Sequence, residues 1–359
     1  MRGALLFASV FSALLVWTGL SALWSIDSDA SLRELERDAL YLAAFAAAFG
    51  FLRVGGAAAI GAGVAVGAGA VAGYSLVELA VGRGRTFIDS SVPSAPIGYA
   101  NALAILSLLG AIASVSLAAF AGSSRERLAW LSLLGILCPT ILLTGSRGTV
   151  LVAGVVVSMA LILWLGPILR GRIRPAALAV GVLLAASIIC GGAFLGRSQL
   201  ARNDRVAYWR VAAQDLESHV AVGSGAGTYD AYWRHHPKAV QLIPLEAHSL
   251  YLETGAELGA VGLALLLATI ALPLGSAIRN GSLSTLRHDP IRLGATCAYL
   301  AFVVHAAIDW DWEIPVVVVS GLYFATVLLG TDGKDPRPVL DGQSAGGGMP
   351  LRAGLTSRR

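Results

Sequence analysis

A polar segment, residues 197–247, lies between two long apolar regions and leads into the sequence EAHSLY at 246–251. Ionisable groups that gather in one polar segment of an otherwise apolar chain mark a candidate functional site. His248 stands where the next helix is expected to begin, so the helix dipole disfavours its protonated form and leaves the ring available as a general base. Glu246 and Glu253 are the nearby carboxylates that could orient the ring. The alternative is a histidine that makes a structural hydrogen bond.

A second candidate residue, Arg147, lies within the sequence TGSRG at 144–148, between two apolar runs. A guanidinium at the membrane boundary suits a planar, bidentate grip on phosphate oxygens. The alternative is an arginine whose charge reaches out to lipid headgroups. The flanking glycines favour a functional interpretation, because small residues let a bulky ligand approach the backbone.

Residues 203–212 (NDRVAYWRVA) have the periodicity of an amphipathic helix. The expected apolar stripe consists of Val206, Trp209 and Ala213. Arg205 and Arg210 are five positions apart and do not share one face. One of them could bind an anionic ligand while the other pairs with Asp204 or Asp215. A helix lying on the membrane surface with solvated arginines is the other interpretation.

Two further segments carry polar groups. The sequence GSGAGT at 223–228 could turn backbone N–H groups toward an anion, but a tight turn is the simpler interpretation, and the lysine of a nucleotide-binding loop is missing. The sequence HAAIDWDWE at 305–313 places His305, Asp309 and Asp311 between two apolar runs. We expect these three residues to line the site of an acceptor substrate or to support that site structurally. We expect no metal site.

Composition indicates an all-α, polytopic membrane protein. Of 359 residues, 56% are hydrophobic and 13% charged, mean hydropathy is +0.72, and apolar runs of roughly membrane-spanning length recur. The continuous runs argue against a β-barrel, whose strands alternate. The cysteines lie singly in apolar runs, so neither disulfides nor zinc is indicated. The net charge of +4 does not identify a partner.

About ten transmembrane helices are predicted. They cover residues 3–23, 38–53, 55–81, 97–120, 129–145, 148–166, 176–196, 248–272, 292–308 and 314–330. The first is expected to be a retained helix rather than a signal peptide. Seven helices thus lie within 1–196 and three within 248–330, separated by the loop 197–247 with short amphipathic helices. The arginine distribution places the N-terminus inside and this loop outside. Residues 331–359 are expected to form a disordered cytoplasmic tail.

Taken together, these segments resemble the O-antigen ligase and polymerase superfamily of bacterial polysaccharide enzymes. The resemblance rests on LWSID at 23–27, SRG at 146–148, Arg205 four residues before Trp209, GSGAG at 223–227, EAHSLYLE at 246–253 and ELGAVG at 257–262. The order and spacing of these motifs across residues 20–330 make the match fairly specific. The chain differs in having fewer predicted helices than many members, which have about twelve.

The resemblance implies a GT-C-like bundle in the bacterial inner membrane, with its active face outside the cytoplasm. It implies transfer of a glycan from an undecaprenyl-diphosphate carrier to a polysaccharide or lipid acceptor, with inversion and without cofactor, metal or nucleic acid. Arg147 and Arg205, with Arg210 as a further candidate, would bind the diphosphate, and His248 would activate the acceptor hydroxyl. The alternatives are a transporter or lipid-binding membrane protein, or an inactive scaffold for envelope assembly.

Overall fold

The computed structural model describes residues 1–82, 92–165, 205–235, 246–279, 286 and 288–330. These residues form helices and contain no strand, which confirms the all-α prediction. The helices are α1 (Arg2–Ser21), α2 (Ser28–Ala80), α3 (Ala100–Phe120), α4 (Ser124–Ser132), α5 (Leu134–Leu143), α6 (Arg147–Leu165), α8 (Arg205–Ser218), α9 (Tyr229–His235), α10 (Leu250–Arg279), α12 (Pro290–His305), the 3-10 turn η2 (Asp311–Glu313) and α13 (Pro315–Gly330).

Within the described residues, five helical segments are long and apolar enough to cross a membrane: α1, α2, α3, α4 with α5, and α10. The helices α12 and α13 and the beginning of α6 are shorter and apolar. The chain is therefore a membrane protein. The predicted span 176–196 and the tail 331–359 lie outside the described residues, so the count of ten stays a prediction.

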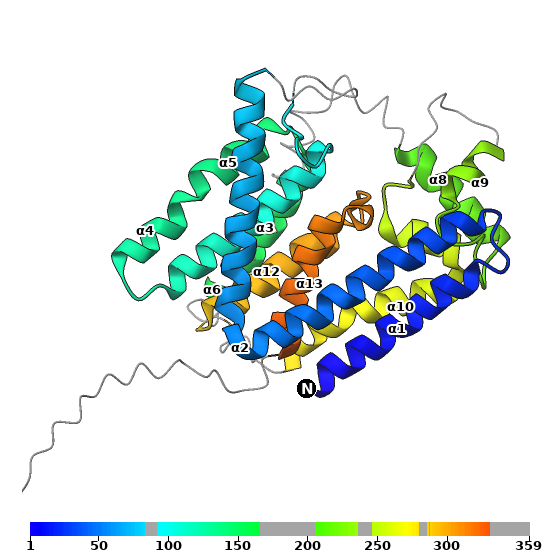
Figure 1. The fold of residues 1–359 in the computed structure, drawn as a ribbon, viewed down its shortest axis with the longest axis horizontal. Helices are drawn as coiled ribbons and strands as arrows, with labels where there is room; N and C mark the ends of the chain where they lie inside the picture. Colours follow the sequence, from blue (N-terminus) through cyan, green and yellow to red (C-terminus); the bar gives the residue numbers. More distant parts are fainter. Residues whose placement is uncertain (83–91, 166–204, 236–245, 280–285, 287, 331–359) are drawn as a thin grey trace, which may run out of the picture.

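The helix α2 differs from the two spans predicted at 38–53 and 55–81. It begins ten residues earlier, at Ser28, because the Asp27 side chain accepts the backbone N–H of Ala30 and caps it. It is also one helical run, interrupted at Gly56, whose φ of 77° is left-handed. Figure 1 shows the ribbon turning sharply, so that the first part runs beside α1 and the second part beside α3.

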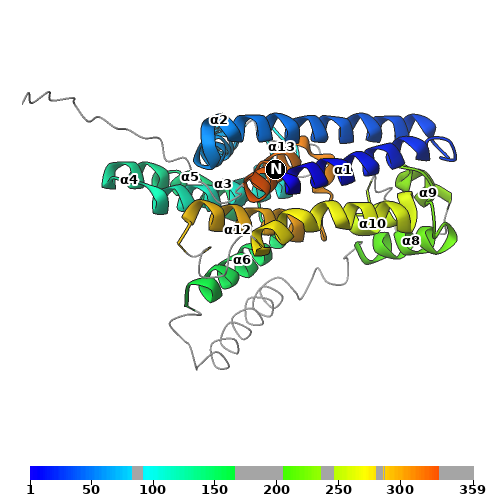
Figure 2. The same ribbon diagram turned by 90° about the horizontal axis from the view of Figure 1, so that it is seen from below.

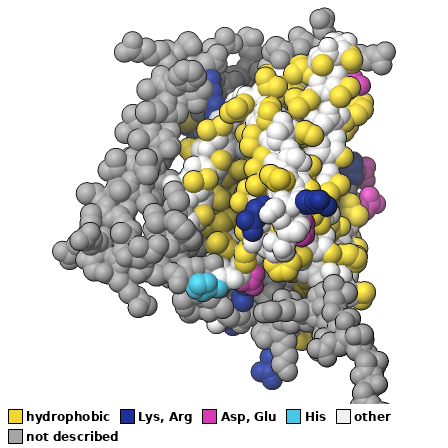
Figure 3. Space-filling model, turned by 90° about the vertical axis from the view of Figure 1, so that its left-hand side faces the viewer, with side chains coloured by type: hydrophobic (Ala, Val, Ile, Leu, Met, Phe, Trp, Pro, Cys, Tyr) yellow, Lys and Arg dark blue, Asp and Glu magenta, His cyan; other side chains and the backbone are white. Residues whose placement is uncertain are grey.

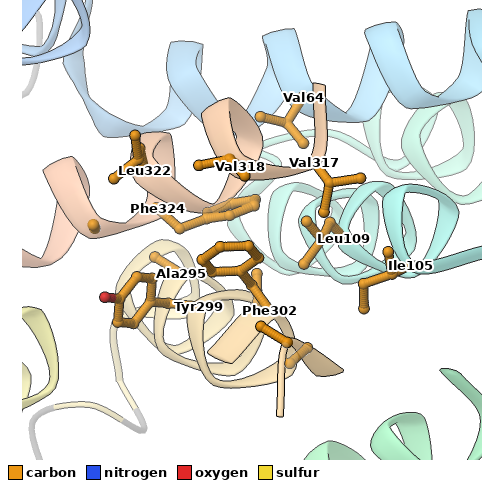
Figure 4. Close-up of a cluster of buried hydrophobic side chains, with 14 of the residues drawn as sticks. Val64, Ile105, Leu109, Ala295, Tyr299, Phe302, Val317, Val318, Leu322 and Phe324 are labelled. Carbon is orange, nitrogen blue, oxygen red and sulfur yellow. The ribbon is translucent and has the colours of Figure 1, made fainter. Parts of the chain in front are cut away.

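The hydrophobic core lies where α12 and α13 meet α3 and the second part of α2. Figure 4 shows Phe302 and Phe324 facing each other, with Val64 and Leu109 on the neighbouring helices. Helices approach closely here because small residues stand at the contacts: a Cβ on Gly110 would lie 2.5 Å from Cβ of Ala68. Small residues at helix contacts are typical of close packing between membrane helices.

The two ends of the bundle have different character. At one end, Gly3 packs against Leu329, and Ser276 donates a hydrogen bond to the carbonyl of Leu328. At the other end lie α8 and α9, beside the end of α1 and the beginning of α10 (Figures 1 and 2). The polar contacts described below gather at this second end.

Much of the outer surface is hydrophobic. In the view of Figure 3, hydrophobic side chains cover most of the described surface, and charged side chains are few. Large exposed apolar residues include Leu5, Val54 and Leu142, with exposed fractions of 61%, 90% and 73%. Soluble proteins rarely expose apolar surface on this scale, whereas helices facing lipid do.

Candidate functional site

Arg205 and Asp309 form an ion pair at the polar end of the bundle. The first helical residue of α8, Arg205, donates to Oδ2 of Asp309 at 3.2 Å and to the carbonyl oxygen of Ile308 at 2.7 Å. Asp309 is buried and also accepts from the Tyr99 hydroxyl at 2.6 Å and from Nδ2 of Asn101 at 2.7 Å. The partner of Arg205 is therefore Asp309 rather than Asp215, and Asp204 lies outside the described residues.

His248 lies against this ion pair in a half-buried position. Its ring centroid is 6.2 Å from that of Trp310 and 5.4 Å from that of Tyr208. Its Nδ1 is 3.1 Å from the carbonyl oxygen of Glu246. If Nδ1 carries the proton, this bond leaves Nε2 with a free lone pair. Burial lowers the pKa of His248; the hydrogen bond to the Glu246 carbonyl and the charge of Asp309 oppose this change, and Arg205 adds to it.

The backbone of His248 is also unusual. Its φ of 56° is left-handed, a conformation that residues other than glycine rarely adopt. The Trp209 indole donates to its carbonyl oxygen at 3.4 Å, and Leu250 N–H donates to the carbonyl of Ala306 at 2.9 Å. Such conformations persist where the surrounding contacts hold them, and they cluster at functional sites.

The two carboxylates expected to orient His248 do not contact its ring. The side chains of Glu246 and Glu253 hydrogen-bond to each other, and Glu253 accepts the backbone N–H of Ala247 at 2.7 Å. A bond between two carboxyl groups requires a proton on one of them, and burial raises the pKa of Glu246. The ring is oriented by a backbone carbonyl instead.

Glu246 and Glu253 belong, with Glu313, to a group of three carboxylates that could hold a cation. One oxygen each of Glu246, Glu253 and Glu313 lies within 4.8 Å of the others. Arg37 forms ion pairs with Glu313 and with Glu34, so a cation of the protein already neutralises part of this cluster.

Arg147 is the first residue of α6 and is exposed. The residues next to it are held by buried side-chain hydrogen bonds. The Thr149 hydroxyl is 3.0 Å from Oγ of Ser146 and 3.1 Å from Nε2 of His305. On its other side, His305 Nδ1 lies 2.5 Å from Oδ2 of Asp311. His305 and Asp311 are fully buried, so neither side chain is exposed beside Arg147.

The pair Asp309 and Asp311 is divided between two separate networks. Asp309 binds Arg205, Tyr99 and Asn101, whereas Asp311 binds His305. This arrangement differs from a shared cation site formed by both carboxylates.

The second arginine of α8, Arg210, lies apart from Arg205 and His248. Arg210 is exposed, and the face of α8 that packs inward consists of Tyr208, Val211, Ala212 and Asp215. The predicted stripe through Val206, Trp209 and Ala213 was therefore wrong: Val206 is 51% exposed. The inward face includes Asp215, which binds Ser224 and His219, and hydropathy alone does not predict a buried carboxylate.

The glycine segment 223–228 forms the turn that was expected, and the anion it surrounds belongs to the protein itself. The Glu257 carboxylate accepts the backbone N–H groups of Gly227 at 2.8 Å and Tyr229 at 2.9 Å. Gly223, Gly225 and Gly227 all have left-handed φ angles. Sequence reasoning missed this role of Glu257, although a carboxylate early in an apolar helix is a signal for one.

The site therefore belongs to a membrane protein that collects a cation, an imidazole and several carboxyl groups at one end of its helices. Residues 130–267 match the family described as O-antigen ligase, which confirms the resemblance to that superfamily over this part of the chain. Arg147, Arg205, Arg210 and His248 all lie within the matched segment, whereas residues 305–313 lie beyond it. A search of curated proteins found no match.

Proposed function

We propose that this protein transfers a glycan from an undecaprenyl-diphosphate carrier to a hydroxyl of a polysaccharide or lipid acceptor. The family match supports a glycosyltransferase-like activity of the ligase or polymerase type. The observation that carries the proposal is the closeness of a guanidinium and a neutral imidazole. Arg205 donates to the carbonyl of Ile308, and the His248 ring lies 6.2 Å from that of Trp310, so both side chains meet the segment 308–310.

In the proposed reaction, Nε2 of His248 takes the proton of the acceptor hydroxyl. The oxygen attacks the anomeric carbon of the carrier-linked sugar, and the bond from that carbon to the phosphate oxygen breaks. Direct attack inverts the anomeric configuration. The diphosphate leaves with the electron pair of the broken bond, and Arg147 and Arg205 stabilise its developing charge. No cofactor or metal is required for this step.

The proposed setting is the inner membrane of a bacterium, with the polar end of the bundle outside the cytoplasm. A lipid-linked diphosphate lies at the membrane boundary, where the exposed Arg147 at the beginning of α6 could reach it. The carrier would approach within the lipid bilayer, and the acceptor from the aqueous side.

The test is a transfer assay with purified protein in liposomes that contain undecaprenyl-diphosphate oligosaccharide, with products identified by mass. Addition of one repeat to a lipid-linked chain identifies a polymerase, and transfer to another acceptor identifies a ligase. His248→Ala should abolish product. His235→Ala is the matched control, because His235 is exposed and, among the residues that the structure describes, its ring bonds to the carbonyl of Ala231 in its own helix. Full activity of His248→Ala would refute the proposal.

A further inference from the structure

The segment 305–311, which we call the corner, connects α12 to η2 and contacts all three parts of the candidate site. Arg205 donates to the carbonyl of Ile308 and to Asp309. The backbone N–H of Leu250, two residues after His248, donates to the carbonyl of Ala306 at 2.9 Å. The beginning of α6, which carries Arg147, packs against the same corner. Three segments far apart in the sequence are thus held by one short turn.

The contact with α6 is close. A Cβ placed on Gly148 would lie 3.2 Å from Cδ1 of Ile308 and 3.3 Å from Nε2 of His305. Thr149, one residue further along, meets the same Nε2 through its hydroxyl at 3.1 Å. Arg147 is therefore adjacent to two consecutive residues that are fixed on the corner.

The hydrogen bonds of this contact form a continuous chain. With the proton of a neutral His305 on Nδ1, that nitrogen donates to Asp311, and Nε2 accepts the hydrogen of the Thr149 hydroxyl. The Thr149 oxygen then accepts from the Ser146 hydroxyl. In this tautomer the Asp311 carboxylate orients the imidazole, and the imidazole meets the first turn of α6 through Thr149.

Burial excludes a direct chemical role for these groups. Thr149, His305 and Asp311 are each 0% exposed, and Ser146 is 2% exposed. A buried polar network of this kind contributes more to a defined geometry than to net stability. Arg147 itself is exposed at the end of the network.

We infer that Thr149, His305 and Asp311 are positioning residues that hold Arg147 at a fixed place relative to Arg205 and His248, so that both guanidinium groups bind one diphosphate. This inference rests on the proposed function. It assigns a role to residues beyond the family-matched segment. It also explains why Asp311 and His305 are buried together between apolar helices.

The experiment measures carrier binding rather than turnover. Wild-type protein, Thr149→Val, Arg147→Ala and the double variant are compared for their Kd toward undecaprenyl diphosphate in detergent, and each melting temperature is recorded. Thr149→Val keeps the shape of the side chain and removes only the hydroxyl. It should weaken binding about tenfold in the wild-type background, a change typical of coupled neighbours. In the Arg147→Ala background it should have no further effect, because it acts through Arg147.

Thr326→Val is the matched control. Thr326 is also a fully buried helical threonine, but its hydroxyl donates only to the carbonyl of Leu322 in its own helix. It should leave Kd unchanged. Thr149→Ser keeps the hydroxyl and should restore binding. His305→Gln should reproduce the loss and its dependence on Arg147.

The outcomes separate the two proposals. If wild-type protein does not bind the diphosphate lipid, the proposed function is wrong. If wild-type protein binds it, but the effects of Thr149→Val and Arg147→Ala on Kd are independent, the positioning inference is wrong and the proposed function stands. Unchanged binding in both Thr149→Val and His305→Gln would also overturn the inference.

Discussion

The carboxylate of Glu257 accepts the backbone N–H of Gly227 at 2.8 Å, which ties the beginning of α10 to a glycine turn thirty positions earlier in the chain. The same side chain accepts Tyr229 N–H at 2.9 Å. Backbone groups complete the contact, since Ser224 N–H donates to the carbonyl of Ala256 at 3.1 Å and Gly225 N–H donates to the carbonyl of Glu257 at 2.8 Å. A buried acid of a membrane protein thus organises the polar loop above it.

Glu257→Ala should destabilise the fold. It leaves two backbone N–H groups without their acceptor, and each such group costs about 1–3 kcal/mol when buried. Glu257→Gln keeps one acceptor oxygen and should cost less. Thermal unfolding in detergent measures the difference. Glu217→Ala removes an exposed carboxylate from α8 and is the control. Equal melting temperatures for Glu257→Ala and Glu217→Ala would contradict this role.

Activity should persist to lower pH than an ordinary histidine allows. Burial lowers the pKa of His248 from the usual 6.5, so the ring remains neutral and able to accept a proton below that pH. The acid limb of kcat/KM should therefore have its midpoint below 6.5. The stability of the fold should change with pH in the same direction. As pH falls through 6.5, His248 of the unfolded chain binds a proton that the folded protein resists, so the free energy of unfolding decreases. An acid limb above 6.5 would exclude His248 as the titrating base.

Arg205→Ala should have two effects that can be separated. It removes a diphosphate ligand in the proposed reaction, and it leaves the buried Asp309 with fewer partners, at a cost of about 1–3 kcal/mol. Combining it with Asp309→Asn should recover much of the melting temperature and none of the transfer activity. Arg210→Ala should have a smaller effect on both, because Arg210 is exposed on α8. Recovery of activity in the double variant would show that Arg205 acts only structurally.

Gly56→Ala should destabilise α2 by about 1–3 kcal/mol, because φ 77° with ψ 167° is a backbone conformation essentially restricted to glycine. No atom lies within 4 Å of the added Cβ, so backbone strain is the whole effect. Gly63→Ala is the matched control, because Gly63 is helical and equally open, and alanine favours helix over glycine. The two substitutions should shift the melting temperature in opposite directions. A shift in the same direction would contradict the break at Gly56.

The helical class and most helix positions could be predicted, because lipid imposes apolar runs of a fixed length that hydropathy detects. The gap between the two predicted spans lies within about two residues of the break at Gly56. The early beginning of α2 was not predicted, because it depends on the cap formed by Asp27. Arg205 and His248 were predicted from residue type and context. The partners of these side chains, Asp309 and the carbonyl of Glu246, could not be predicted, since long-range contacts bring them together. The inward face of α8 was mistaken because a buried carboxylate, Asp215, replaces an apolar residue there.

The break in α10 at Gly259 separates the acidic residues of this helix from its long apolar part. Gly259 has a φ of 66°, and the amide groups of Ala260 and Val261 beyond it donate to the carbonyls of Val220 and Ala221. The part that follows, residues 260–279, is about 30 Å long at 1.5 Å per residue, which matches a hydrocarbon core of ~30 Å. Glu253 and Glu257 lie before the break, outside the stretch whose length matches the hydrocarbon core. The thirty-residue helix is thus divided into an acidic piece and a piece of membrane-spanning length.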